Sequence, residues 1–454
     1  MDTVAEHARA QTASALETLH RLARQPSVAA TGEGIGECAA LVGRVFEDAG
    51  ARVAVHALPG AAPLVIAEFP GETERTLLFY DHYDVQPPEP LDEWTSPPFA
   101  PTVRDGRLFG RGVGDNKGDL VTRLAAVRAV QAARGRLPCR VVFVVEGEEE
   151  IGSVHFGAYV RRHAAALRAD GCIWEFGQRD VKERLQVTLG VKGICYLDLE
   201  IHATSRDLHS SLGAIVDGAG TRMAWALASL KDPATGSVLV EGFYDRVREP
   251  SARELEAARR LPFDEEELKR QMGVDRFIGG ATGFDALHRL LFAPTCTVCG
   301  VESGYTGVGS KTVLPRRARA KVDFRLVPDQ DPEEIAALVR DHFARQGLEV
   351  SVRLLGGERA HRTDLDDPFV ALVSGVAAEA TGREVVVLPT SAGTGPMHDL
   401  ATVVGAPIVS IGTSYWGARA HAPDEHIRLA DFEETIGLMA RLIERFAGAR
   451  LSPG

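Results

Sequence analysis

The first 190 residues alternate between short apolar runs and longer segments with apolar residues at helical spacing. Residues 36–49 carry Leu41, Val42 and Val45 on one helical face. Residues 76–80 and 140–145 are continuous apolar runs, which is typical of strands buried on both faces. Further strands are expected at 53–58, 64–69 and 171–174, and further helices at 15–22, 120–133 and 154–167. This alternation predicts an α/β unit with a mostly parallel sheet and helices on both faces.

The pattern changes after Leu189. Residues 196–202 and 319–327 alternate apolar and polar positions, which predicts half-exposed strands. Helices are expected at 215–230 and 332–346, and another strand at 349–355. Two helices on one antiparallel sheet would make an α+β domain.

After residue 364 the α/β pattern returns. Helices are expected at 369–381 and 431–446, and strands at 385–388 and 408–411. We therefore expect residues 1–190 and 364–454 to form one catalytic domain, interrupted by an inserted α+β domain over residues 191–363. The length of 454 residues also favours two domains, because single cores rarely grow that large.

Composition narrows the partners. The net charge of -12 argues against a nucleic-acid groove, which needs clustered lysine and arginine. No apolar run approaches the roughly 20 residues that span a membrane. The first 24 residues predict an amphipathic helix rather than a secretory signal, so we expect a cytoplasmic protein. The six cysteines demand no disulfide, and Cys296 and Cys299 lack the second ligand pair of a structural zinc site.

Metal-binding residue types follow five of the predicted strands or lie in the adjoining loops. These residues are His82, Asp115, Glu149 with Glu150, Glu175 and His421. Each has an ordinary structural explanation on its own, as a turn residue, a helix cap or part of a solvated loop. In open α/β sheets, however, ligands bind outside the carboxyl ends of the strands, where distant residues converge. The combination therefore predicts a metal site.

The ligand chemistry suits two divalent ions bridged by one carboxylate. If Glu149 acts as a general base, two histidines and three carboxylates remain as ligands. Zinc, manganese and cobalt accept such a mixed set better than magnesium does, and zinc is our first expectation. Asp84, two residues after His82, is placed to orient the histidine ring.

These motifs resemble the M20 family of co-catalytic metallopeptidases, and its carnosinase-like dipeptidase branch in particular. The resemblance rests on four motifs and covers nearly the whole chain. They are Tyr-Asp-His-Tyr-Asp-Val-Gln-Pro at 80–87, Asp-Asn-Lys-Gly at 115–118, the glutamate-rich motif at 146–153 and the terminal histidine motif at 420–425.

The resemblance implies a role for each of these residues. His82 and Glu175 would hold one ion and Glu150 and His421 the other, with Asp115 bridging both. Glu149 would deprotonate the attacking water and pass the proton to the leaving amine. The family also implies a cis peptide bond after the bridging aspartate.

For the inserted domain, the resemblance implies a lid that also forms a homodimer. His209, in an Asp-Leu-His-Ser motif, would stabilise the oxyanion, in many relatives from the partner subunit. Arg325 would bind the free carboxylate of the substrate. Thr312 belongs to the family's substrate segment, and Ser391, Gly393 and Thr394 lie in a glycine-rich loop that would complete the pocket.

Four positions depart from the family pattern. Asp81 stands where glycine is usual, Ser211 and Ala214 replace glycines, and Glu175 replaces an aspartate as in the deacylase branches. The first three could narrow the site or alter the lid hinge. The leading hypothesis is therefore a dipeptidase or carboxypeptidase-like hydrolase, with an N-acyl-amino-acid deacylase as the alternative. A family member without activity is a third possibility, against which the complete ligand set argues.

Overall fold

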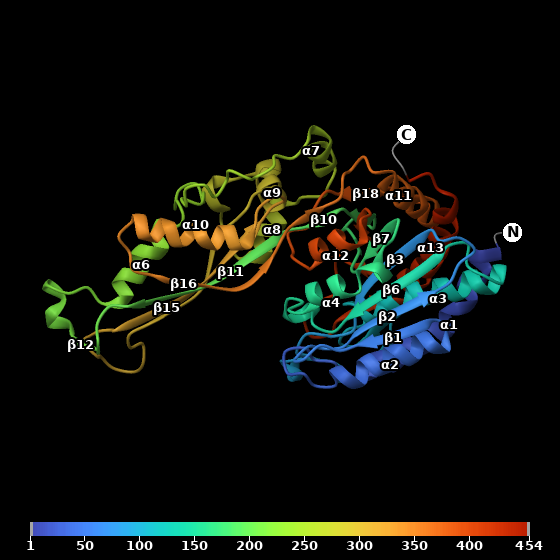
Figure 1. The fold of residues 1–454 in the computed structure, drawn as a ribbon, viewed down its shortest axis with the longest axis horizontal. Helices are drawn as coiled ribbons and strands as arrows, with labels where there is room; N and C mark the ends of the chain where they lie inside the picture. Colours follow the sequence, from blue (N-terminus) through green and yellow to red (C-terminus); the bar gives the residue numbers. More distant parts are fainter. Residues whose placement is uncertain (1–2, 452–454) are drawn as a thin grey trace.

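A ten-stranded sheet forms the larger of two bodies in the computed structural model, which describes residues 3–451 (Figure 1). Its strands, in spatial order, are β1 (Arg52–His56), β2 (Leu64–Phe69), β6 (Arg140–Glu146), β3 (Thr76–His82), β7 (Gly171–Trp174), β19 (Ile408–Ser410), β9 (Leu185–Thr188), β8 (Gln178–Arg179) and β20 (Ser414–Tyr415), with β18 (Val385–Leu388) beside β9. The central strands β6, β3, β7 and β19 run parallel, which confirms the predicted sheet. Their carboxyl ends therefore meet at one edge, where His82 lies opposite Glu146.

Helices cover both faces of this sheet, as predicted. In β3, Leu77 and Phe79 point to one core while Leu78 and Tyr80 point to another, because side chains alternate along a strand. The first core contains α1 (Thr3–Arg24), α2 (Ile35–Asp48), α3 (Lys117–Arg134), α11 (Pro368–Thr381) and α13 (Leu429–Gly448). The second contains α4 (Phe156–Arg162), α5 (Ala164–Leu167) and α12 (Met397–Val404). A sheet covered on both faces explains why β3 is buried along its whole length.

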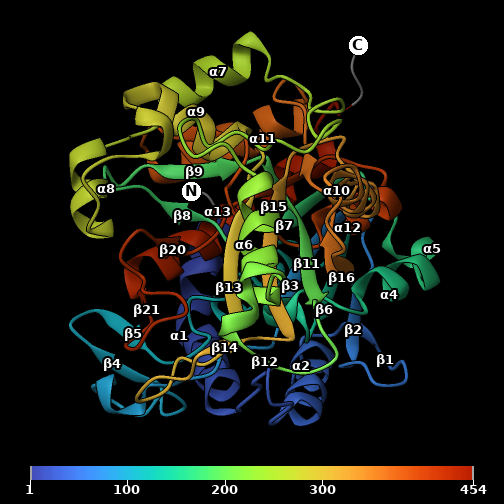
Figure 2. The ribbon, with the colours of Figure 1, turned by 90° about the vertical axis from the view of Figure 1, so that its left-hand side faces the viewer.

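The second body, which we call the lid, is a four-stranded antiparallel sheet with helices on one face (Figure 2). Its order is β13 (Thr297–Ser303), β15 (Arg317–Leu326), β11 (Gly193–His202) and β16 (Ser351–Glu358), and it packs against α6 (Ala219–Ser229) and α10 (Pro332–Arg345). Leu197, Leu199 and Ile201 are buried against these helices, which confirms the alternation seen in the sequence. The edge strand β13 was not predicted, since its residues are mostly exposed.

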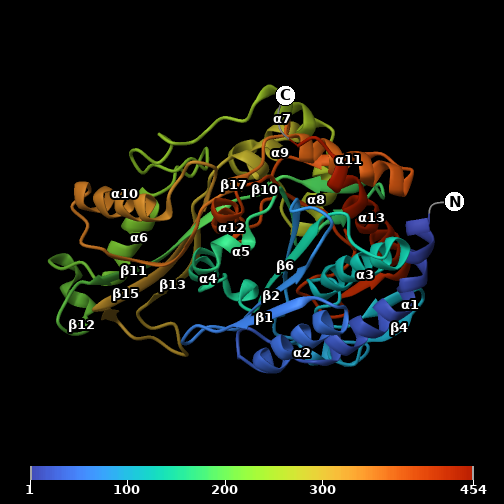
Figure 3. The ribbon, with the colours of Figure 1, turned by 45° about the vertical axis from the view of Figure 1, so that its right-hand side comes forward.

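The two chain crossings between the bodies lie side by side. Strand β10 (Gly190–Val191) pairs with β17 (His361–Arg362) in a short antiparallel ladder. The opposite end of the lid carries β12 (Leu208–His209) and β14 (Val313–Leu314), far from the large sheet (Figures 1 and 3).

The other elements lie around these bodies. They are β4 (Thr102–Arg104), β5 (Arg107–Phe109), β21 (His426–Arg428), α7 (Ala252–Arg259), α8 (Glu265–Met272) and α9 (Gly283–Phe292), with short 3-10 turns η1 (Leu91–Glu93), η2 (Glu149–Ile151), η3 (Ser210–Ala214) and η4 (Ile278–Gly280). None of the helices within residues 3–451 is both long and apolar enough to cross a membrane. The N-terminal helix was expected to include Met1 and Asp2, which lie outside the described residues.

Candidate metal centre

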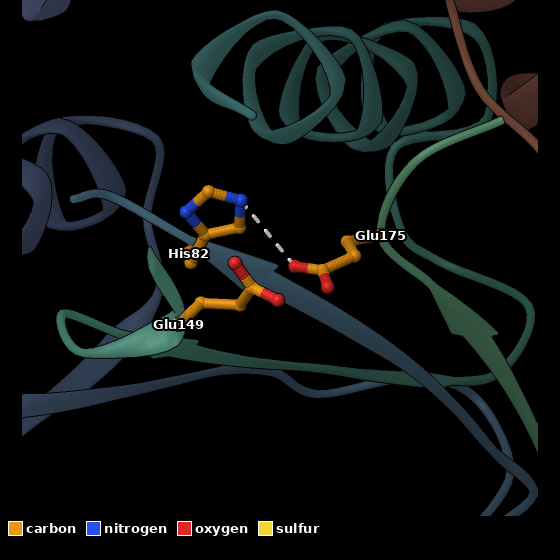
Figure 4. Close-up of side chains that lie close together, drawn as sticks. All are labelled: His82, Glu149 and Glu175. Atoms are coloured by element: carbon orange, nitrogen blue, oxygen red, sulfur yellow. Dashed lines mark ion pairs between the residues drawn. The ribbon is translucent and has the colours of Figure 1, made fainter. Parts of the chain in front are cut away.

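One group of candidate ligands forms around His82, the last residue of β3. Its Nε2 lies 3.1 Å from Oδ1 of Asp115 and 3.5 Å from Oε2 of Glu175, which follows β7. Glu149, in the turn η2 after β6, turns its carboxylate toward the same space (Figure 4). Ligand atoms of His82, Glu149 and Glu175 all lie within 4.8 Å of one another.

A second group adjoins the first and shares Asp115 with it. Nε2 of His421 lies 3.1 Å from Oδ2 of Asp115 and 3.1 Å from Oε2 of Glu150. The two carboxylate oxygens of Asp115 therefore point to different histidines, Oδ1 to His82 and Oδ2 to His421. This is the arrangement in which one carboxylate can bridge two ions.

Asp84 contacts a candidate ligand of each group. Its Oδ1 lies 3.3 Å from Nδ1 of His82, and its Oδ2 accepts a hydrogen bond of 3.0 Å from the backbone N–H of Glu150. The side chain is completely buried. The hydrogen bond of the His82 ring itself goes to the backbone carbonyl of Asp84, at 3.1 Å from Nδ1. Asp84 therefore orients the ring through its backbone, with its carboxylate beside it, and fixes the backbone of Glu150.

Glu425 holds the loop that carries the bridging aspartate. Its carboxylate accepts hydrogen bonds from the backbone N–H groups of Gly112, Gly114 and Asp115, at 3.1, 2.9 and 3.1 Å. It also pairs with the buried guanidinium of Arg111 at 2.8 Å. Sequence reasoning missed this role, although the residue closes the terminal histidine motif; a glutamate four residues after a ligand histidine was the available signal.

The peptide bond between Asp115 and Asn116 is cis, as the resemblance implied. Asp81, one of the departures from the family pattern, has a structural explanation. Asp81 faces away from the ligands, and its Oδ1 accepts a hydrogen bond of 2.7 Å from the fully buried Arg123. Burial raises the pKa of Asp81 to about 7, although Arg123 opposes the shift. The expectation that Asp81 narrows the site is therefore wrong, because strand alternation points it into the protein beneath the cluster.

The electrostatics of the centre favour divalent cations. Burial raises the pKa of Glu149 to about 8. Burial, with repulsion from Glu149 as the second cause, raises the pKa of Glu175 well above its usual value. Hydrogen bonds to Asp115 and Glu150 raise the pKa of His421 to about 10. Oε2 of Glu175 and Oδ1 of Asp84 are buried without a hydrogen-bond partner. A cation stabilises the ionised form of buried carboxylates of this kind, so the residues fit two metal ions.

A cleft of about 940 Å³ connects the centre with the open face of the lid sheet. Glu149, Glu150 and His421 line one side, and Arg325 of β15 lines the other. The Arg325 guanidinium donates a hydrogen bond of 2.8 Å from Nη1 to Oγ1 of Thr394. Arg325 and Thr394, both predicted to bind substrate, therefore line the same cleft as three of the candidate metal-site residues. Ser391 and Gly393 belong to the same loop as Thr394 but do not line the cleft.

His209 and Thr312 lie together but away from the metal centre of their own chain. Nε2 of His209 is 3.5 Å from Oγ1 of Thr312, at the exposed tip of the lid where β12 meets β14 (Figures 1 and 3). Ser211 donates its backbone N–H to Nδ1 of His209, and its hydroxyl lies 2.9 Å from the same nitrogen, a contact that a glycine at this position could not make. One chain alone therefore does not combine these residues with the metal ligands.

Known proteins are similar to this chain in sequence and fold. The model of Peptidase family M20/M25/M40 matches residues 78–445. A Beta-Ala-His dipeptidase from Rattus norvegicus is 31% identical over 285 residues, which cover 62% of this chain and 58% of the rat protein. A Cys-Gly metallodipeptidase dug1 from Schizosaccharomyces pombe is 31% identical over 289 residues, 62% of this chain and 60% of the yeast protein. These matches span less than two thirds of either relative.

A solved structure extends the likeness to the whole fold. The M20 family metallo-carboxypeptidase Sso-CP2 from Sulfolobus solfataricus superposes with a TM-score of 0.90 and 38% sequence identity. The superposition covers 95% of this chain and 99% of that protein. The inserted α+β lid is therefore part of the shared architecture.

Proposed function

Because the chain belongs to peptidase family M20/M25/M40, we propose that it is a dinuclear metal-dependent hydrolase of dipeptides or similar small substrates with a free C-terminal carboxylate. One observation carries this proposal. The carboxylate of Asp115 lies 3.1 Å from a histidine on either side, and Glu149 stands beside the same space. This geometry supplies a bridge for two ions and a base next to them.

The candidate ligands divide into two sets. His82 and Glu175 would hold one ion, Glu150 and His421 the other, and Asp115 both. When bound, the ions polarise the substrate carbonyl and make water more acidic. Zinc is the first expectation, with manganese or cobalt as alternatives, because imidazole and carboxylate ligands suit all three.

The side chains of the cleft then divide the work of amide hydrolysis. Glu149 accepts a proton from the attacking water and returns it to the leaving amine, and burial strengthens this carboxylate as a base by raising its pKa. Asp84 keeps the His82 ring in its orientation. Arg325, steadied by Thr394, binds the substrate carboxylate through its free N–H groups.

The proposal includes a homodimer formed through the lid. The edge strand β13 has an unpaired side and exposes Val298 and Val301, and the adjacent α6 exposes Trp225. Such an edge is usually covered in a soluble protein. A partner docked there would allow His209 and Thr312 of one subunit to reach the centre of the other. A cytoplasmic location agrees with the six free cysteines among the described residues.

A hydrolysis screen tests the function. Metal-stripped protein is reloaded with zinc, manganese or cobalt and mixed with pooled dipeptides or pooled N-acyl amino acids, and products are identified by mass spectrometry. We expect metal-dependent loss of the dipeptides, with E149Q as the inactive control. Loss of the acylated pool alone would assign the chain to the deacylases, and loss of neither pool would overturn the proposal.

A further inference from the structure

Glu358, the last residue of β16, stands on the same wall of the cleft as Arg325. Strand β11 lies between them, and Ile194 of β11 is paired with Glu358 on one side and with Arg325 on the other. Residues directly opposite each other in a sheet share a face. The three side chains therefore form one row on the open face of the lid sheet, and all three line the cleft.

The Glu358 carboxyl has no cationic partner among residues 3–451. Neither a hydrogen bond nor an ion pair involves its side chain. The nearest charged groups do not help. Asp399 repels it, and Arg161, which lines the same cleft, pairs with that aspartate at 3.8 Å. Burial, with Asp399 as the second cause, raises the pKa of Glu358 to about 8.

A second acidic group on this wall also lacks a full set of partners. Asp323 lies two residues before Arg325 on β15, on the same face, and is only 9% exposed. Its Oδ2 lies 3.2 Å from Nε of Arg325, whereas its Oδ1 is buried without a hydrogen-bond partner. This wall therefore presents the Arg325 guanidinium to a ligand in the cleft. It also presents the carboxyl groups of Glu358 and Asp323, each of which has unused hydrogen-bonding capacity.

An isolated carboxylate in a partly buried site is costly, and a ligand cation removes that cost. We propose that Glu358 binds an ammonium or guanidinium group of the substrate while Arg325 binds its carboxylate. This inference rests on the proposed function and narrows the substrate class to peptides that carry a cation in addition to the free C-terminal carboxylate.

The spacing fits one or two amino-acid residues. Neighbouring strands are ~4.8 Å apart, so Arg325 and Glu358, two strands apart, are separated by roughly 9.6 Å at the backbone. Side chains that lean toward a common ligand shorten this gap. An extended dipeptide spans about 7 Å, and an extended lysine or arginine side chain is of similar length. The cation can thus be the α-amine of a dipeptide or the side chain of its C-terminal residue.

Four substrates, each cleaved after glycine, distinguish whether the cation is the α-amine or the side chain of the C-terminal residue. They are glycyl-lysine, glycyl-leucine and their N-acetylated forms, assayed with the metal-loaded full-length enzyme and with E358Q. The neutral glutamine keeps the shape of the side chain, so folding should be preserved. E349Q, an exposed position just before β16, is the matched control.

We expect E358Q to lower kcat/KM roughly tenfold to a hundredfold on substrates with the recognised cation, and much less on acetyl-glycyl-leucine. Selective loss on both unacetylated peptides identifies the α-amine, and selective loss on both lysyl peptides identifies the side chain. An equal effect on all four substrates, or an effect shared by E349Q, would overturn the inference. Absence of hydrolysis by the unaltered enzyme would instead contradict the proposed function.

Discussion

The metal centre and the substrate wall of the lid are built on different principles. The centre lies at the carboxyl ends of parallel strands, where buried partners such as Asp84 and Glu425 hold each element through several hydrogen bonds. The wall is the open face of an antiparallel sheet, and its cation Arg325 is held by two side-chain contacts, one to Thr394 and one to Asp323. The candidate metal ligands are thus held through several contacts in one body, while the residues proposed for substrate recognition lie in a body joined to it by two short strands.

Metal removal tests this difference with the largest expected effect. A chelator should reduce hydrolysis by at least about a thousandfold, because carbonyl polarisation and water activation are lost together. Hydrogen exchange measured by mass spectrometry should rise at residues 112–118 and 146–153, since their carboxylates then repel one another. Exchange in β11 and β15 should remain unchanged. An equal rise in both bodies would show that the metal ions stabilise the lid as much as the loops that carry the candidate ligands.

Subunit mixing tests whether the lid tip serves the partner. H209A and E149A should each be nearly inactive, because one lacks the oxyanion donor and the other the base. A refolded one-to-one mixture should regain about a quarter of the original activity, since half of the dimers are mixed and each has one intact site. Recovery in the mixture is measured by dipeptide hydrolysis. A mixture that stays inactive would place His209 outside the partner's site.

Replacing Arg325 tests the wall of the lid directly. R325M should lower kcat/KM about tenfold to a hundredfold, mainly through KM, because a charge-assisted hydrogen bond to the substrate carboxylate is lost. Arg319 lies on the same strand and face but pairs with Asp198, so R319M is the matched control. A substrate with an amidated C-terminus should respond equally weakly to both variants. If R325M loses kcat with unchanged KM, Arg325 acts on the reaction itself.

The smallest effect concerns the junction of the two bodies. Burial, helped by His398 and Arg248, lowers the pKa of His361 in β17 to about 4. The unfolded chain, with a pKa near 6.5, binds the proton first, so stability should fall as the pH drops from 6.5 toward 4 and stay constant above that window. The loss should be at most about 3 kcal/mol. Urea unfolding of H361Q should show a shallower pH dependence, whereas H202Q, at an exposed position, should match the unaltered protein.

Many elements of both bodies were predictable from local pattern alone. Short continuous apolar runs are typical of strands covered on both faces, and this pattern identified β3 and β6. Alternating apolar and polar residues identified β11 and β15, because one face of each strand is buried and the other is exposed. Several expected bounds were inexact. The helix expected at 154–167 is divided into α4 and α5 at His163, the helix expected from 215 begins at Ala219, and the helix expected at 15–22 is part of the longer α1. The strand β13 carries almost no buried side chain, so no apolar pattern marks it.

The sequence by itself determined which residue types follow the strands, and therefore that His82, Asp115, Glu149 and His421 should meet at one edge. Only the tertiary structure decided how they meet: that Asp115 turns one oxygen to each histidine, that Glu425 holds its loop, and that the lid tip lies away from its own centre. The physical reason is distance along the chain. Contacts between residues separated by hundreds of positions depend on strand order and loop paths, which local periodicity does not encode.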